Sequence, residues 1–170
     1  MLVDTRNLSN AVFRHSSVCT CYKQEPYLRV RLFLFLLVQY LHNMQKDFDS
    51  WNEVKKKTDT EVSRLYTVRE MWWCRLGINV GTEQDGSPDN FVRPVLIIRG
   101  LGPNACLVVP LTTSKREHSL RVPIGLVENR EARANISQLR VIDTRRLGEK
   151  IGFLDKEHFA YIRKTARTLF

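Results

Sequence analysis

The sequence predicts a mainly β protein with helices (the α+β class): a small β-barrel with a C-terminal helix and an N-terminal helical extension. Between residues 71 and 154, short apolar runs alternate with clusters of Gly, Asn, Asp, Ser and Pro, which is typical of short strands joined by turns. Outside this region, apolar residues recur at the three- to four-residue spacing of a helix. A chain of 170 residues allows one domain with an appendage.

Residues 1–43 differ in pattern from the rest and are expected to be a leader outside the folded domain. Their apolar stretch from Leu32 to Val38 is much shorter than the about 20 residues that a membrane-spanning helix needs, so no membrane segment is expected. The stretch also fits the apolar region of a signal peptide, but no small-residue cleavage site follows it. We expect Met44 to be the natural start and residues 1–43 to be upstream sequence from a misassigned initiation codon.

Residues 44–67 are predicted to form the helical extension. Ser50 and Glu53 have the spacing of a capping box, in which each side chain accepts a hydrogen bond from the backbone N–H of the other residue. Apolar residues recur at helical spacing and predict one narrow buried face, made of Phe48, Trp51, Val54, Val62 and Leu65.

The barrel domain is predicted over residues 68–170. Its strands are expected at residues 71–76, 95–98, 105–111, 120–124, 135–142 and 151–154. Apolar residues in the segment 135–142 do not alternate cleanly, so a β-bulge is expected there. The last strand is short and is expected at an edge of the sheet.

The chain is predicted to end in a helix that begins after Asp155, because aspartate is a favourable N-cap residue. The buried face of this helix is expected to consist of Phe159, Ile162, Ala166 and Leu169.

The charge of the chain favours a polyanionic partner. Twenty-seven basic residues stand against 18 acidic ones, which gives a net charge of +9. A basic surface without any such partner is the alternative, because charge alone is weak evidence.

The four cysteines are not spaced as zinc ligands. Cys19 and Cys21 have no matching pair downstream, whereas Cys74 and Cys106 lie in apolar strand patterns and are expected to be buried, reduced thiols. Nothing in the sequence requires a disulfide bond, so a reducing cytoplasm is the expected location.

Arg93 and Thr112 are the main candidates for chemistry. Pro94 forces an extended backbone on Arg93, and a fixed arginine at a strand start can bind a phosphate with two N–H groups. The alternative is a surface arginine paired with Asp89 or Glu83. The hydroxyl of Thr112 can donate to a phosphoryl oxygen, although β-branched residues also commonly fill strand positions.

Other polar residues are weaker candidates. Lys115 and Arg116 follow the threonines and are natural phosphate contacts. RNA hydrolysis often uses a histidine pair as acid and base, but His118 and His158 have no evident partners in the sequence. No Asp, Glu and His cluster has metal-ligand spacing, so metal-free chemistry is expected, and no cofactor.

Three segments together resemble the PemK/MazF family of toxin endoribonucleases: EMWWCRLGINVGTEQDGSPDNFVRP, VLIIRG and ACLVVPLTTS. In that family, a loop that reads like GSEQxG precedes a strand that opens with RPV, and a later strand ends in PxTT. The likeness covers roughly residues 68–170. This chain departs from the short form of the loop, because residues 87–91 are inserted before Val92.

The resemblance implies an SH3-like barrel, usually paired into a homodimer, that cleaves single-stranded RNA without a metal ion. It implies that Arg93 and Thr112 are catalytic. It implies substrate-binding roles for Glu83, Gln84, Thr113, Ser114, Lys115, Arg116, Gln138 and Arg140. A structural role is the alternative for Gln138 and Arg140. A cognate antitoxin, expected to be acidic with a disordered tail, is the implied protein partner.

Two other functions remain open at this point. Relatives on the same barrel inhibit a protein target, DNA gyrase, without cutting RNA. A degenerate barrel that binds RNA without cleaving it is the third reading, and the presence of both Arg93 and Thr112 argues against it.

Overall fold

The computed structural model describes residues 30–34 and 46–170. The chain divides into two compact units, residues 1–45 and 46–170. Residues 30–34 are helical, and the part of the chain that is described contains no helix long and apolar enough to cross a membrane. The predictions for Cys19, Cys21 and a start at Met44 lie outside the described residues.

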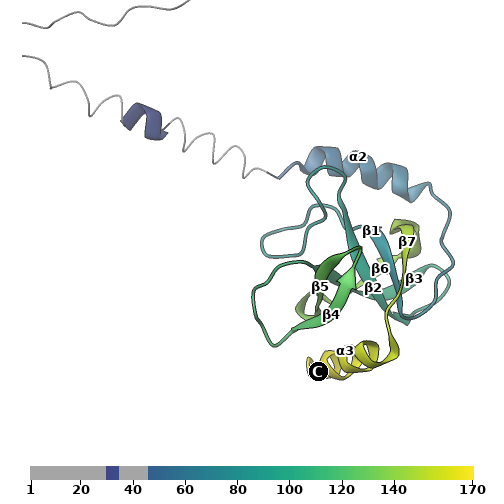
Figure 1. Cartoon of the computed structure of the whole chain (residues 1–170). Helices are drawn as coiled ribbons and strands as arrows, with labels where there is room; N and C mark the ends of the chain where they lie inside the picture. The colour runs from purple at the N-terminus through teal and green to yellow at the C-terminus, as the bar shows by residue number, and fades with distance from the viewer. Residues whose placement is uncertain (1–29, 35–45) are drawn as a thin grey trace, which may run out of the picture. The chain divides into compact units, whose positions relative to one another are not determined.

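Seven antiparallel strands form one curled sheet that has the order β4-β5-β3-β2-β1-β7, with β6 paired to β3 (Figure 1). The strands are β1 (Glu70–Arg75), β2 (Val92–Gly100), β3 (Ala105–Thr112), β4 (Arg121–Val127), β5 (Arg130–Asn135), β6 (Arg140–Asp143) and β7 (Leu147–Phe153). The mainly β class and the barrel-like curl are confirmed. β7 lies at an end of the strand order, as expected for the last strand.

The prediction of one strand over residues 135–142 is wrong. Instead, β5 and β6 run along the same edge of β3, and the 3-10 turn η1 (Ile136–Gln138) separates them. The irregular apolar pattern therefore marks a break in the strand that is larger than a bulge. β5 was not predicted, because its only apolar residues are Ala132 and Ala134, between charged side chains.

The N-terminal helix α2 (Phe48–Asp59) is shorter than predicted, and it begins at a different cap. Asp47 is the N-cap, and its carboxylate accepts from the backbone N–H of Ser50 at 2.9 Å, so the expected capping role of Ser50 is wrong. Trp51 and Thr58, two turns apart, are the buried residues of α2. Beyond Asp59 the chain turns and has no regular secondary structure up to residue 67, and Val62 and Leu65 are 83% and 91% exposed.

The C-terminal helix α3 (Lys156–Arg167) begins after Asp155, as predicted, and this carboxylate accepts from the backbone N–H of His158 at 2.9 Å. Phe159, Ile162 and Ala166 are buried against the sheet. Leu169 follows the end of the helix and is exposed, so its predicted burial is wrong. Figure 1 shows α2 and α3 at opposite ends of the barrel.

Apolar residues pack on both faces of the sheet. In β2, Leu96 and Ile98 belong to the cluster that also contains the α3 residues, whereas Val95 and Ile97 belong to a second cluster with Cys74 and Cys106. The pleat sends alternate side chains to opposite faces, so this strand is apolar on both. A sheet packed on both faces holds the strand ends in fixed positions, and the polar residues at these ends are therefore held rigidly.

Candidate functional site

The strand register places Arg93 and Thr112 side by side. β2 pairs with β3 from Val95 opposite Pro110 onward, and continuing this register by two residues sets Arg93 opposite Thr112, in agreement with the cavity that both residues line. Thr112 is in turn paired with Arg133 of β5. Residues that are directly opposite on neighbouring strands share one face of the sheet. Arg93, Thr112 and Arg133 therefore form a row across three strands.

Arg93 is half-buried and is fixed by hydrogen bonds to the backbone. Its Nε–H donates to the carbonyl oxygen of Asp85, and Nη1 donates to the carbonyl oxygen of Leu111 at 3.3 Å. No ion pair of Arg93 with Asp89 or Glu83 occurs among the described residues. Burial lowers the pKa of Arg93, and the nearby carboxylate of Asp85 partly opposes this shift. A partly desolvated cation interacts more strongly with a phosphate than an exposed one does.

A cavity of about 520 Å³ opens beside Arg93 and Thr112. Its walls come from β1, β2, the end of β3 and the β4–β5 hairpin, and they include Trp73, Ser87, Leu111, Thr113, Val127 and Arg130. Trp73 Nε1 donates to the Glu128 carboxylate at 3.0 Å and so ties the hairpin tip to β1. Glu128 and Asn129 have φ of 48° and 63°, which corresponds to the tight hairpin turn that keeps this tip in place. The cavity is thus open to a ligand and has rigid walls.

Two arginines that the sequence did not single out surround the segment after Thr112. Arg133 Nη1 donates to the Ser114 carbonyl oxygen at 2.9 Å, and Arg121 Nη1 donates to Ser114 Oγ at 3.3 Å. Thr112 Oγ1 accepts from the Ser114 backbone N–H at 3.2 Å, which leaves the hydroxyl proton of Thr112 available to another acceptor. For Arg133, the sequence offered one indication: Glu131 and Arg133 are two residues apart, the spacing that places side chains on one face of a strand. This spacing has meaning only once β5 is recognised as a strand.

Lys115 and Arg116 lie on the exposed segment that follows β3. Their side chains form no ion pair among the described residues, whereas the Arg116 backbone N–H donates to Ser114 Oγ at 3.4 Å. Thr113 is exposed and lines the cavity. The exposed side chains of Lys115 and Arg116 can therefore contact a polyanion that binds near Arg93 and Thr112.

Gln84, Gln138 and Arg140 meet where the β1–β2 loop (residues 76–91) crosses the barrel. Gln138 Oε1 accepts from the Gln84 backbone N–H at 3.0 Å, and Arg140 Nη2 donates to Asn79 Oδ1 at 3.4 Å. Gln84 Oε1 accepts from Asn135 Nδ2 at 2.9 Å. These side chains fasten the loop to the barrel. Glu83 is exposed at the outer surface of the same loop.

The histidines and cysteines in the part of the chain that the structure describes offer no obvious nucleophile or base. His118 is exposed and its Nδ1 accepts from the Leu120 backbone N–H at 3.1 Å, while His158 contacts Asp155 at 2.6 Å. Burial raises the pKa of Cys74 to about 12 and that of Cys106 to about 11, so neither is a thiolate at neutral pH. Within residues 30–34 and 46–170, no three His, Cys, Asp or Glu side chains are grouped as metal ligands.

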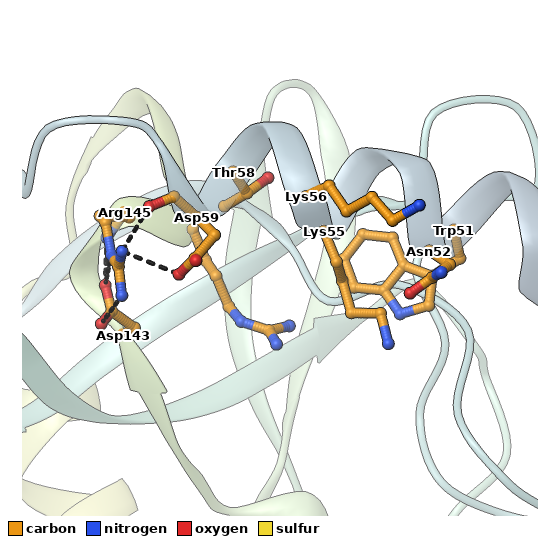
Figure 2. A pocket seen from close by; sticks show the side chains of 9 residues that line it. Trp51, Asn52, Lys55, Lys56, Thr58, Asp59, Asp143 and Arg145 are labelled. Carbon is orange, nitrogen blue, oxygen red and sulfur yellow. Dashed lines mark hydrogen bonds and ion pairs between the residues drawn. The ribbon is translucent and has the colours of Figure 1, made fainter.

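A second cavity, of about 370 Å³, lies between α2 and the 3-10 turn η2 (Thr144–Arg146). Figure 2 shows Arg145 between Asp59 of α2 and Asp143, with Nη distances of 2.9 and 3.0 Å to their carboxylates. Arg145 thus pairs with one carboxylate of α2 and one of the barrel, and it joins α2 to the barrel beside this cavity.

Residues 67–170 match the family described as PemK-like, MazF-like toxin of type II toxin-antitoxin system. Among solved structures, MazF from Deinococcus radiodurans is similar, with a TM-score of 0.51 and 18% identity over 62% of this chain and 96% of that chain. The Mycobacterium tuberculosis toxin MazF-mt6 has a TM-score of 0.47 and 21% identity, over 59% of this chain and 94% of that chain. An endoribonuclease in complex with its cognate antitoxin, from a mycobacterial species, has a TM-score of 0.49 and 18% identity, over 61% and 93%. No curated protein matches the sequence.

The family match spans the whole barrel and α3, and it includes the strand ends that carry Arg93 and Thr112. The fold of the Deinococcus protein agrees with it. The chain belongs to the PemK-like, MazF-like family of toxins from type II toxin-antitoxin systems.

Proposed function

We propose that this protein is the toxin of a toxin–antitoxin pair and acts as an endoribonuclease on single-stranded RNA. The observation that carries the proposal is the row formed by Arg93 and Thr112 beside an open cavity of about 520 Å³. A half-buried guanidinium next to a hydroxyl is suited to a phosphate group. The net charge of +9 favours a polyanionic substrate.

The reaction uses the nucleophile of the substrate itself. The 2′-hydroxyl loses its proton to a base, its oxygen forms a bond to the adjacent phosphorus, and the bond from phosphorus to the 5′ oxygen breaks. The leaving oxygen takes up a proton, so the products are a 2′,3′-cyclic phosphate and a 5′-hydroxyl end. DNA lacks the 2′-hydroxyl and is expected to resist cleavage.

Arg93 and Thr112 stabilise the transition state of this reaction. The guanidinium keeps its proton at any physiological pH, so its role is electrostatic: it balances the charge that develops on the non-bridging oxygens. Thr112 donates its hydroxyl proton to one of these oxygens. Because Arg93 is already held by two carbonyl oxygens, little reorganisation is needed when the charge develops.

The polar residues around the cavity are proposed to hold the RNA strand. Lys115, Arg116 and Thr113 contact its phosphates on one side, together with the arginines Arg121 and Arg133. Glu83, at the exposed surface of the β1–β2 loop, is proposed to read the bases. Gln84, Gln138 and Arg140 are proposed to act on the RNA site indirectly, because their hydrogen bonds hold the β1–β2 loop on the barrel.

The proposal is tested by incubating the protein with mixed-sequence RNA in the presence of EDTA. Discrete fragments that carry 5′-hydroxyl ends, absent from a matched reaction with Arg93→Ala, are the expected result. Intact RNA together with stalled topoisomerase would instead support a toxin that inhibits DNA gyrase. A reaction that depends on an added metal ion would refute the metal-independent mechanism.

The partners are proposed on the basis of the family. Toxins of type II systems are paired with an antitoxin, and the arginines Arg93 and Arg130, which line the cavity, are complementary to an acidic, disordered segment. We expect such a segment to compete with RNA. A homodimer and a cytoplasmic location, where the RNA is found, complete the proposal.

A further inference from the structure

The helix α2 precedes the family match, which begins at residue 67, yet it packs on the loop that holds Arg93. Trp51 is 5% exposed, and its ring lies 5.6 Å from that of Phe91, centroid to centroid. It also covers Gly77, where a Cβ would overlap the indole ring and where φ is 78°. The two ends of the β1–β2 loop therefore meet under Trp51, since the Gly77 N–H donates to the Phe91 carbonyl at 3.0 Å.

Lys46, just before α2, fastens the middle of the same loop. Its Nζ lies 2.8 Å from Asp85 Oδ2 and donates to the Asn79 carbonyl oxygen at 2.7 Å. The other carboxylate oxygen of Asp85 accepts from the Asn79 backbone N–H at 2.6 Å. Lys46 thus contacts both Asn79 and Asp85 of the loop. The Asp85 carboxylate is held by Lys46 at one oxygen and by the Asn79 backbone N–H at the other.

Asp85 is also the residue whose backbone carbonyl accepts from Arg93 Nε. A continuous set of contacts therefore runs from Lys46, through Asp85, to the guanidinium at the cavity. The second acceptor of Arg93, the Leu111 carbonyl, belongs to the barrel and does not depend on α2. Without the loop contact, Arg93 would keep one backbone hydrogen bond and would regain rotational freedom.

We propose that Lys46 and α2 form a positioning element that fixes the orientation of Arg93 through the Asp85 carbonyl. The proposal rests on the endoribonuclease function for its kinetic consequence but not for its structural one. A catalytic group that moves by about 1 Å can lose about 10²-fold in rate, so an anchor outside the barrel has a measurable effect on turnover.

The kinetic test is Lys46→Met, which removes the ammonium and keeps the length of the side chain. Because the ion pair is partly exposed, with 30% and 31% of the two side chains accessible, we expect kcat to fall about fivefold, the equivalent of about 1 kcal/mol. KM should remain within about twofold. Lys46→Arg should restore most of kcat, and the matched control Lys57→Met, which changes an exposed lysine of α2, should behave as wild type.

A double-mutant cycle shows whether Lys46 acts through Asp85. In an Asp85→Asn background, Lys46→Met should have little further effect on kcat, because the contact that it breaks is already weakened. Fully multiplicative effects would overturn the proposal. A raised KM with unchanged kcat would also overturn it, since Lys46 would then bind RNA directly.

A measurement without RNA separates this proposal from the proposed function. In ¹⁵N-labelled protein, the Nε–H of Arg93 should be protected from hydrogen exchange by its bond to Asp85, with the signal assigned from its absence in Arg93→Ala. Lys46→Met should raise its exchange rate at least fivefold, and Lys57→Met should not. Unchanged protection would refute the positioning role even if RNA is cleaved, and loss of protection would support it even if RNA is not cleaved.

Discussion

Replacing Arg93 with alanine is expected to abolish most of the cleavage while leaving the fold in place. The side chain donates to two backbone carbonyls, of Asp85 and Leu111, at the wall of an open cavity. Water can reach these carbonyls once the guanidinium is removed, so the loss of stability should be about 1–2 kcal/mol and not that of a core truncation. The barrel should therefore still be folded at 25 °C.

The effect on the rate follows from the role of Arg93 as a fixed charge. Losing one preorganised donor to a developing oxyanion typically costs about 10²–10³ in rate, or about 3–4 kcal/mol of transition-state stabilisation. Arg93→Lys should recover part of this loss, because an ammonium keeps the charge but lacks the planar fork that donates twice. The two variants thus separate the contribution of charge from that of geometry.

The assay is single-turnover cleavage of a labelled RNA in EDTA, with circular dichroism and thermal unfolding to confirm that each variant is folded. Binding of a non-cleavable RNA in which the 2′-hydroxyls are replaced should change by much less than the rate. Cleavage by folded Arg93→Ala at near the wild-type rate would refute the assignment of the active site. His118 would then be the first residue to test as the source of activity.

Three further outcomes are expected. Thr112→Val keeps the volume of the side chain and deletes the hydroxyl, so kcat should fall about tenfold or more with little change in the unfolding midpoint; an unchanged kcat would leave Thr112 without a catalytic role. RNA binding should weaken as the salt concentration rises, which a titration of the binding constant against salt measures. The double variant Lys115→Ala, Arg116→Ala should reduce the slope of log K against log salt by about 1.4 in magnitude. The control Lys164→Ala should leave this slope unchanged. Glu70 is 4% exposed, and although burial raises its pKa, hydrogen bonds from Lys150, Thr67 and Trp72 outweigh burial and hold the pKa below its ordinary value of 4.5. Its stabilising contribution is therefore complete above that value and is lost as the pH falls through the lower folded pKa. Glu70→Gln should cost about 2 kcal/mol in urea unfolding at pH 7 and progressively less at pH 4 and pH 3; an equal cost at every pH would contradict the ionised state of this carboxyl.

The sequence predicted the strands that carry apolar runs and failed for those that do not. β2 and β3 are buried on both faces and are evident from their composition. β5 has alanines as its buried residues, so its spacing of two was hidden among charges. In α2, aspartate and serine are both favourable N-cap residues, so local preference did not decide between Asp47, which caps the helix, and Ser50.

The site was predictable as residue types but not as an arrangement. Pro94 and the end of an apolar strand drew attention to Arg93 and Thr112, but the resemblance to the toxin family was what favoured a catalytic role for them over a surface or structural one. Their proximity depends on the register between β2 and β3, which no local pattern specifies. Arg133 joins the same row only because β5 pairs with β3, so it could not be found before that pairing was known.

Two features of this chain depend on each other in the structure. One is the segment 87–91 of the β1–β2 loop, and the other is the helix α2, which lies before the family match. Phe91, the last residue of this segment, packs on Trp51 of α2 and has φ of 59°, an unfavourable conformation for an aromatic residue. Burial of two aromatic rings offsets this strain, and Lys46 fastens the same loop at Asp85. The Asp85 carbonyl of this loop accepts from Arg93 Nε, so the proposed positioning element acts on Arg93 through a loop that α2 and Lys46 hold at two places.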